Sequence, residues 1–250
     1  WVEERTLEAY GKHYTVAFPH EEYESGRPRI VSPLYAKLQD HRAVFGSKLG
    51  WERPNWFAPE GMDARDDYSM GRQNWFGPVG EEHAHVREKV GVFDQSSFAK
   101  YELTGPDAAD ALERICANHV AKPAGRLTYT QILNSRGGIE CDLTVARLAD
   151  DHFYIVTGTG SRTHDFAWIE DHLPAGANAR LVDVTEKHGT LSLMGPRARE
   201  VLAAVTGADV GNEAFRFGRV QEIDIAGHRV RAMRVTYVGE LGWELHVPIE

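Results

Sequence analysis

The sequence contains little cysteine and no long apolar run. Its 250 residues include two cysteines, Cys116 and Cys141, and the absence of CxxC spacing argues against a disulfide framework or a Cys-rich zinc site. We expect both to be small buried hydrophobes in a reducing compartment. There is no stretch of 18 apolar residues and no charged, then apolar leader, so we expect a soluble chain without a transmembrane helix or signal peptide.

The sequence also lacks an excess of basic residues and several catalytic motifs. Lys plus Arg number 28 against 37 Asp plus Glu, and the net charge of −9 argues against nucleic acid or an anionic membrane as the partner. GxSxG is absent. Gly158-x-Gly160 lacks the third glycine of a dinucleotide site, because Thr163 stands there. His83 and His85 point in different directions on a helix, so no metal site is predicted.

The composition changes along the chain. Residues 1–80 are rich in aromatics and proline and resemble a linker packed onto neighbouring structure. From residue 81 the periodicity is clearer and predicts a short helix within 81–93 and a strand at 100–104. The chain starts at Trp1 and stops directly after a strand, so we expect it to be a piece of a longer protein.

A repeated motif indicates internal duplication. LTGPDAADALERI (Leu103–Ile115) and LMGPRAREVLAAV (Leu193–Val205) share L-x-G-P-x-A. Each copy predicts a strand end, a glycine turn, a proline in the first helical turn and an amphipathic helix. Two copies are too few for a solenoid, so we predict a duplicated α+β unit.

The segments around the repeats are mostly strands. The paired glycines of NSRGG predict a tight hairpin between LTYTQIL and IECDLTV. Further strands are predicted at HFYIVT and LVDVT, with a helix at SRTHDFAWIEDHL between them, and three or four strands follow within 220–247. Strands joined largely by hairpins, mixed with a few helices, predict an α+β fold with antiparallel sheets and packed helices.

Two acids lie in strands. Alternation places Cys141, Leu143 and Val145 on one face and Asp142 on the other, and the terminal strand places Glu244 in the same way. The pattern alone favours solvent-facing acids, although a carboxylate on a rigid strand also suits acid–base chemistry. If both acids converged on one pocket with Tyr129 and Tyr237, they would suit a flat, nitrogen-rich ligand.

Several motifs, in order, resemble a known superfamily. GVFDQSSFAKYELTGPDAADAL, GRLTYTQILNSRGGIECDLTVARL, FYIVTGTGSRTHDFAWIE, LMGPRA and VTYVGELGWELHVP resemble the folate-binding aminomethyltransferase (glycine-cleavage T-protein) superfamily. GKHYTVAFP through SPLY, and AVFGSKLGWERPNWFAPEG, resemble the connecting region of dimethylglycine and sarcosine dehydrogenases, which are flavoproteins with a folate half. The likeness covers nearly all of residues 11–249.

The resemblance implies a domain organisation and an activity. Residues 1–50 would be the tail of a flavin domain and a linker, 51–80 a connecting segment, and 81–250 an aminomethyltransferase-type folate-binding domain, incomplete at its C-terminus. FAD, in a preceding domain, would oxidise an N-methyl amine such as dimethylglycine or sarcosine. Tetrahydrofolate would capture the one-carbon unit as 5,10-methylenetetrahydrofolate. We expect a cytoplasmic location, with the mitochondrial matrix as the alternative.

The resemblance also implies site residues. Asp142 corresponds to the aspartate near the bridging nitrogens of tetrahydrofolate and becomes the catalytic candidate, although Cys141 replaces the first acid of the usual Asp-Asp-Leu. Glu244 corresponds to the glutamate that pairs with the pterin, and Tyr237 and Tyr129 to nearby aromatics. The alternatives are a stand-alone aminomethyltransferase or demethylase, a non-catalytic folate-binding protein, and a fold that has lost folate.

Overall fold

The structure, a computed structural model, describes residues 1–249. The chain divides into two compact units, residues 1–86 and residues 87 onward, and the division falls within one helix, α3 (Phe76–Glu88). Each unit is described by itself.

The first unit is built around a β-hairpin with a small core. Its elements are α1 (Val2–Lys12), α2 (Tyr35–Asp40), β1 (Ala43–Lys48) and β2 (Trp51–Phe57). Val44, Trp56 and Ala58 form the buried cluster, and the buried Glu52 pairs with Arg27 at 2.6 Å. The composition of residues 1–80 gave little sign of this hairpin, and the expected boundary at residue 50 lies in its turn.

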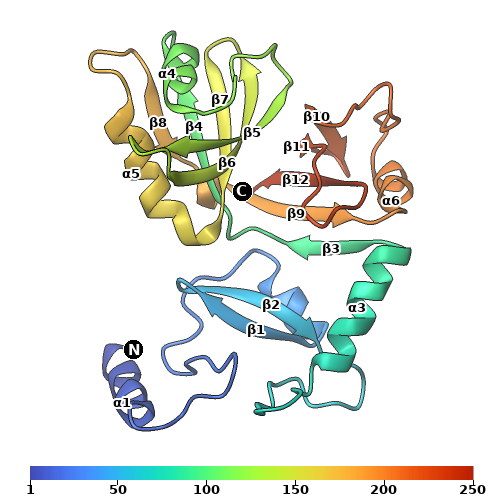
Figure 1. Cartoon of the computed structure of the whole chain (residues 1–250). Helices are drawn as coiled ribbons and strands as arrows, with labels where there is room; N and C mark the ends of the chain where they lie inside the picture. The colour runs from blue at the N-terminus through green and yellow to red at the C-terminus, as the bar shows by residue number, and fades with distance from the viewer. Residues whose placement is uncertain (250) are drawn as a thin grey trace. The chain divides into compact units, whose positions relative to one another are not determined.

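The second unit contains two five-stranded antiparallel sheets (Figure 1). Four strands have the same order in each sheet, but the fifth differs, because β8 follows the other four strands in the chain whereas β3 precedes them. The first sheet runs β5-β6-β7-β4-β8 and the second runs β10-β11-β12-β9-β3. The strands of the first sheet are β4 (Ala99–Thr104), β5 (Leu127–Leu133), β6 (Ile139–Ala149), β7 (His152–Thr157) and β8 (Arg180–Asp183). Those of the second are β3 (Gly91–Asp94), β9 (His188–Met194), β10 (Val220–Ile225), β11 (His228–Met233) and β12 (Gly242–Pro248). The predicted duplication and α+β class are therefore confirmed.

The two copies of the repeat occupy equivalent places. In each, a sheet strand leads through a glycine into a short helix, α4 (Ala108–Ile115) or α6 (Ala198–Val205). Gly105 and Gly195 have φ of +127° and +134°, and a Cβ would lie 2.2 Å and 2.4 Å from a backbone carbonyl. Only glycine fits such a turn. The prolines precede the helix caps rather than lying in the first helical turn.

The helices cover the outer faces of the sheets. α4 and α5 (Arg162–His172) pack on the first sheet around Tyr101, Leu112 and Ile169, and α6 packs on the second around Leu202. A third cluster contains residues of both sheets, including Tyr154 of β7 and Met233 of β11. Burial of these apolar faces is the main force that holds the unit together.

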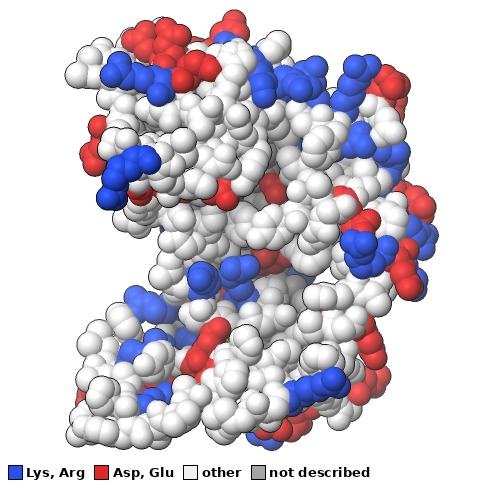
Figure 2. All heavy atoms as spheres, viewed as in Figure 1, with Lys and Arg blue, Asp and Glu red and all other residues white. Residues whose placement is uncertain are grey.

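Two details of the sequence prediction need correction. The helix expected within 81–93 corresponds to α3, which ends at Glu88. Residues 91–93, which the prediction included in the helix, belong to β3 because they pair with β9. Cys141 is buried as expected, but Cys116 is only partly buried. None of the helices in residues 1–249 is long and apolar enough to cross a membrane. Basic and acidic residues lie interspersed over the face shown in Figure 2.

Candidate functional site

A cavity of about 670 Å³ in the second unit is lined by strands of both sheets and by two loops. The first sheet contributes β5, β6 and β7, and the second contributes Glu244 of β12. The segments 217–218 and 235–237, together with Phe98, Gly158 and Ser161, complete the lining. Tyr129, Asp142, Tyr237 and Glu244, which are separated by up to half of the sequence, all line this one cavity.

Asp142 is positioned by the regular alternation of β6. Cys141 and Leu143 turn toward the core, and Asp142 turns away from it and is exposed. It stands opposite Gln131 of β5, and a hydrogen bond with Asp142 raises the pKa of Tyr129. The Tyr129 phenol and the Asp142 carboxylate therefore lie next to each other in the cavity wall.

Glu244 lies in a different environment from Asp142. The alternation of β12 favoured a solvent-facing acid, but Glu244 is only 8% exposed. The reason is that β12 is an inner strand between β11 and β9, and its second face packs toward the other sheet. A buried carboxylate needs polar partners, and the fully buried His246 on the same face lies 3.7 Å away.

The two tyrosines form exposed parts of the cavity wall. Tyr129 is 60% exposed and Tyr237 is 71% exposed. Tyr237 lies in the loop between β11 and β12, and its ring meets Phe98 edge to face with a centroid distance of 6.3 Å. Both rings therefore retain free faces on which a flat ligand can stack.

The lining contains residues that sequence reasoning missed. Thr157 ends β7, and its Oγ1 lies 3.2 Å from the carbonyl oxygen of Asp142 and 2.5 Å from Asp165 Oδ2. Gly158, considered above only as part of a nucleotide motif, also borders the cavity. The apolar wall comes from Phe98, Leu127, Val156, Phe217 and Val235. No local pattern marks these residues, because strand pairing across the sheet brings them together.

A buried lysine lies close to Glu244. Lys100 of β4 is fully buried, and its Nζ donates to the backbone oxygens of Ser96 at 2.8 Å and Thr185 at 3.4 Å. Burial lowers the pKa of Lys100 to about 8, and the acids around it, Glu244 among them, oppose that shift. The lysine thus adds positive potential behind the cavity.

Three potential metal ligands cluster beneath β6. Ligand atoms of Cys141, His164 and Asp165 lie within 4.8 Å of one another, a donor set of the kind that binds zinc. They are already paired: His164 Nδ1 is 3.0 Å from Asp165, and burial raises the pKa of the Cys141 thiol. A metal would have to displace these protons. His83 and His85 are exposed on α3 and belong to no such cluster in residues 1–249.

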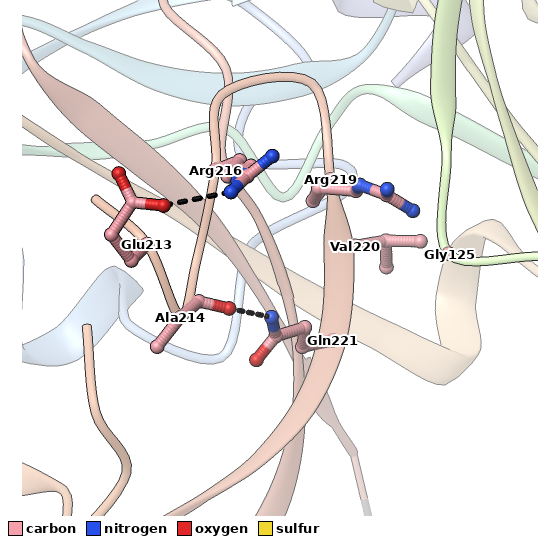
Figure 3. A pocket seen from close by; sticks show the side chains of 7 residues that line it. All are labelled: Gly125, Glu213, Ala214, Arg216, Arg219, Val220 and Gln221. Carbon is pink, nitrogen blue, oxygen red and sulfur yellow. Dashed lines mark hydrogen bonds and ion pairs between the residues drawn. The ribbon is translucent and has the colours of Figure 1, made fainter. Parts of the chain in front are cut away.

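A second, smaller cavity of about 300 Å³ is lined by Gly125 and by residues within 213–221 (Figure 3). Arg216 and Arg219 line it, and Arg216 pairs with Glu213 at 2.7 Å. Gln221 donates to the carbonyl of Ala214 at 2.8 Å. It contains none of the four predicted site residues.

Comparison with known proteins places this architecture. The chain is 37% identical to the mitochondrial dimethylglycine dehydrogenase of Rattus norvegicus over 98% of its length, and it spans 29% of that protein. It is 37% identical to human mitochondrial sarcosine dehydrogenase over 99% of its length and spans 31% of that protein. The crystal structure of the glycine cleavage system aminomethyltransferase T from Bartonella henselae superimposes with a TM-score of 0.71 at 28% identity, covering 88% of this chain and 54% of the other.

Family models divide the sequence near residue 33. Residues 1–32 match the FAD dependent oxidoreductase central domain. Residues 34–250 match the GCVT N-terminal domain. This second match covers most of the chain and includes both sheets and the cavity between them, so the chain belongs to the GCVT N-terminal domain family.

Proposed function

We propose that this chain forms the tetrahydrofolate-binding part of a flavin-dependent enzyme that oxidises N-methyl amines. In this proposal the region captures the one-carbon unit of the amine as 5,10-methylenetetrahydrofolate. The observation that carries the proposal is the convergence of two carboxylates and two tyrosines, from both sheets, on one cavity of about 670 Å³. Sites of this size that bind small molecules are typically apolar with a few well-placed polar groups.

The cavity fits a folate in size and in chemistry. Its apolar wall and the free faces of Tyr129 and Tyr237 suit the flat rings of the ligand. Glu244 offers a buried carboxylate, and a carboxylate pairs bidentately with the adjacent N–H donors of a pterin. Exposed Asp142 lies on a different strand, which separates the acid that would recognise the pterin from the acid that would serve the chemistry.

The proposed chemistry needs a proton acceptor and negative charge at one point of the cavity. Tetrahydrofolate, when bound, supplies nucleophilic nitrogens that take up a one-carbon unit. Asp142 would accept the proton released by the attacking nitrogen and would stabilise developing positive charge by its own negative charge. Tyr129, whose pKa is raised by Asp142, would lie beside the carboxylate and could donate to it.

The activity of the whole enzyme extends beyond this region. The chain spans about 30% of the length of the curated relatives it matches and contains one short match to a flavin domain. We therefore assign FAD and the amine substrate to sequence outside residues 34–250, with N-methylated glycines as the substrate class suggested by the names of those relatives. Both relatives are called mitochondrial. For this chain the cytoplasmic location remains a prediction, and the mitochondrial matrix remains its alternative.

The experiment that tests the proposal is calorimetric titration with tetrahydrofolate. The parent should bind with micromolar affinity, Glu244→Ala should bind about tenfold more weakly or worse, and Asp142→Ala should bind nearly as well as the parent. Asp171→Ala, which removes an exposed acid of α5 outside the cavity, is the matched control. A parent that does not bind tetrahydrofolate contradicts the proposal.

A second measurement separates this reading from a stand-alone aminomethyltransferase. In the protein with its flavin domain, Asp142→Ala should retain amine oxidation and lose formation of 5,10-methylenetetrahydrofolate. Equal loss of both reactions would remove the assigned role of Asp142. A protein that binds tetrahydrofolate but neither binds flavin nor oxidises N-methyl amines would support the stand-alone alternative.

A further inference from the structure

A chain of buried polar side chains lies behind Glu244. Tyr154 of β7 and His246 of β12 are both fully buried. The Nδ1 atom of His246 lies 3.0 Å from the Tyr154 hydroxyl and 3.2 Å from Thr190 Oγ1. Its Nε2 atom lies 3.7 Å from Glu244 Oε2 and has no hydrogen-bond partner within residues 1–249.

The direction of the hydrogen bonds follows from the chemistry of the partners. Burial raises the pKa of Tyr154 and lowers the pKa of His246, so the pair is a phenol and a neutral imidazole. The guanidinium of Arg231, whose Cζ is 4.4 Å from the centre of the Tyr154 ring, carries only donors and cannot accept the phenol proton. The Tyr154 O–H therefore donates to His246 Nδ1.

This bond fixes the tautomer of His246. A neutral imidazole has one N–H, and because Nδ1 accepts from Tyr154, the proton must be on Nε2. The opposite tautomer would direct a bare nitrogen lone pair at the Glu244 carboxylate and would leave the buried phenol without an acceptor. The Nε2–H consequently faces Glu244.

Two other donors near Glu244 have hydrogen-bond partners. Lys100 uses two of its three N–H groups on backbone oxygens, and Ser192, which stands opposite Glu244 in the sheet, donates to Gln95. His246 Nε2–H is a buried donor without such an engagement. A distance of 3.7 Å is too long for a hydrogen bond. A shift of the Glu244 carboxylate by less than about 1 Å toward Nε2 would complete it.

We propose that His246 is a positioning residue that donates its Nε2–H to Glu244 and orients the carboxylate for the N–H groups of the pterin. The inference rests on the proposed function, since it assigns a purpose to Glu244 in folate binding. Tyr154 acts on Glu244 indirectly, because it sets the tautomer of His246 and does not contact Glu244 itself. The ring of His188 also meets Tyr154 edge to face, with 5.8 Å between ring centroids, but no hydrogen bond joins the two residues within residues 1–249.

The test uses two substitutions that each retain one half of the imidazole. His246→Gln places an N–H near the position of Nε2 and retains the donor to Glu244. His246→Asn places its oxygen near the position of Nδ1, so it can accept from Tyr154 but loses the donor. His246→Gln should bind tetrahydrofolate within about threefold of the parent, and His246→Asn about tenfold more weakly, the factor that corresponds to about 1.4 kcal/mol.

A double-mutant cycle separates positioning from general damage to the fold. In a Glu244→Ala background His246→Asn should change the affinity less than about twofold, because the group that it positions is gone. Equal weakening by Gln and Asn, or an Asn effect that persists in this background, would overturn the inference. If Glu244→Ala weakens binding while neither His246 variant does, the proposed function stands and the inference fails.

The tautomer itself is measured without any ligand. Nitrogen NMR of the protein labelled at histidine, with His246 assigned by its loss in His246→Asn, should show a neutral ring protonated at Nε2. A ring protonated at Nδ1 overturns the proposed role of His246, whatever the tetrahydrofolate titration gives. A parent that shows the expected tautomer but fails to bind tetrahydrofolate contradicts the proposed function, and the role of His246 in folate binding falls with it.

Discussion

Replacement of Glu244 by glutamine should weaken tetrahydrofolate binding strongly while leaving the fold intact. The amide has nearly the same shape as the carboxylate, so the close packing of β12 is preserved. It has one acceptor oxygen in place of two, and its NH2 group must face either the donors of the pterin or Nε2–H of His246. In both orientations two donors meet, and one hydrogen bond of the pair is lost.

The size of the effect follows from the burial of the site. Glu244 is 8% exposed, so water does not replace the lost bond. A hydrogen bond to a charged group contributes about 1.5–3 kcal/mol, which corresponds to about a 10- to 150-fold increase in Kd. Calorimetric titration of the parent and of Glu244→Gln measures this directly, with thermal unfolding of both as the control for the fold. A change in Kd of less than twofold, at unchanged thermal stability, would refute the reasoning.

Three further predictions concern the interior of the second unit. Gly195→Ala should lower the free energy of unfolding by more than about 2 kcal/mol, because Gly195 has a positive φ and an added Cβ would lie 2.4 Å from a carbonyl oxygen. Urea unfolding measures the change. Gly207→Ala, where an added Cβ meets open space, is the control. The pKa of Lys100 is lowered from 10.5 to about 8 in the folded protein, so between these pH values the unfolded state binds more protons. The free energy of unfolding should therefore rise by about 2 kcal/mol from pH 7.5 to 9.5 because of this group. Lys100→Met should remove that rise in parallel urea titrations. Cys116 is partly buried, and desolvation raises the pKa of its thiol to about 12. Cys116 and the buried Cys141 should both resist a thiol reagent at pH 8 until urea is added, and rapid labelling of Cys116 in the native protein would contradict the raised pKa.

Local patterns in the sequence were sufficient for most elements of the second unit, with β3, which was predicted as part of a helix, as an exception. The alternation in β6 put Cys141 and Leu143 inside and Asp142 outside, as the structure has them. Period-two patterning works there because β6 presents one face to the core and one to the cavity. The two copies of L-x-G-P-x-A correctly predicted equivalent strand–turn–helix units, since Gly105 and Gly195 serve the same turn.

The environment of Glu244 was not available from the same kind of pattern. Alternation separates the two faces of a strand, but it does not say that both are covered. β12 is an inner strand and its second face meets the other sheet, so Glu244 and His246 are buried. That packing depends on pairings between residues far apart in the sequence. The four residues that meet in the cavity were predicted from family resemblance rather than from local physics.

The place of β3 has a consequence for the order in which the second unit folds. The first sheet uses only residues 99–183, in consecutive strands joined by two short hairpins and two connections that contain helices. β3 precedes all of them, yet its partner is β9 at residues 188–194. Closing a long loop costs chain entropy before the contacts that offset this cost can form. We therefore expect the first sheet to form early and β3 to pair later, because its partner strand lies about a hundred residues further along the chain. The edge strand of the second sheet would then be the last part of the unit to pair. The cavity wall that contains Glu244 would form after the wall that contains Asp142.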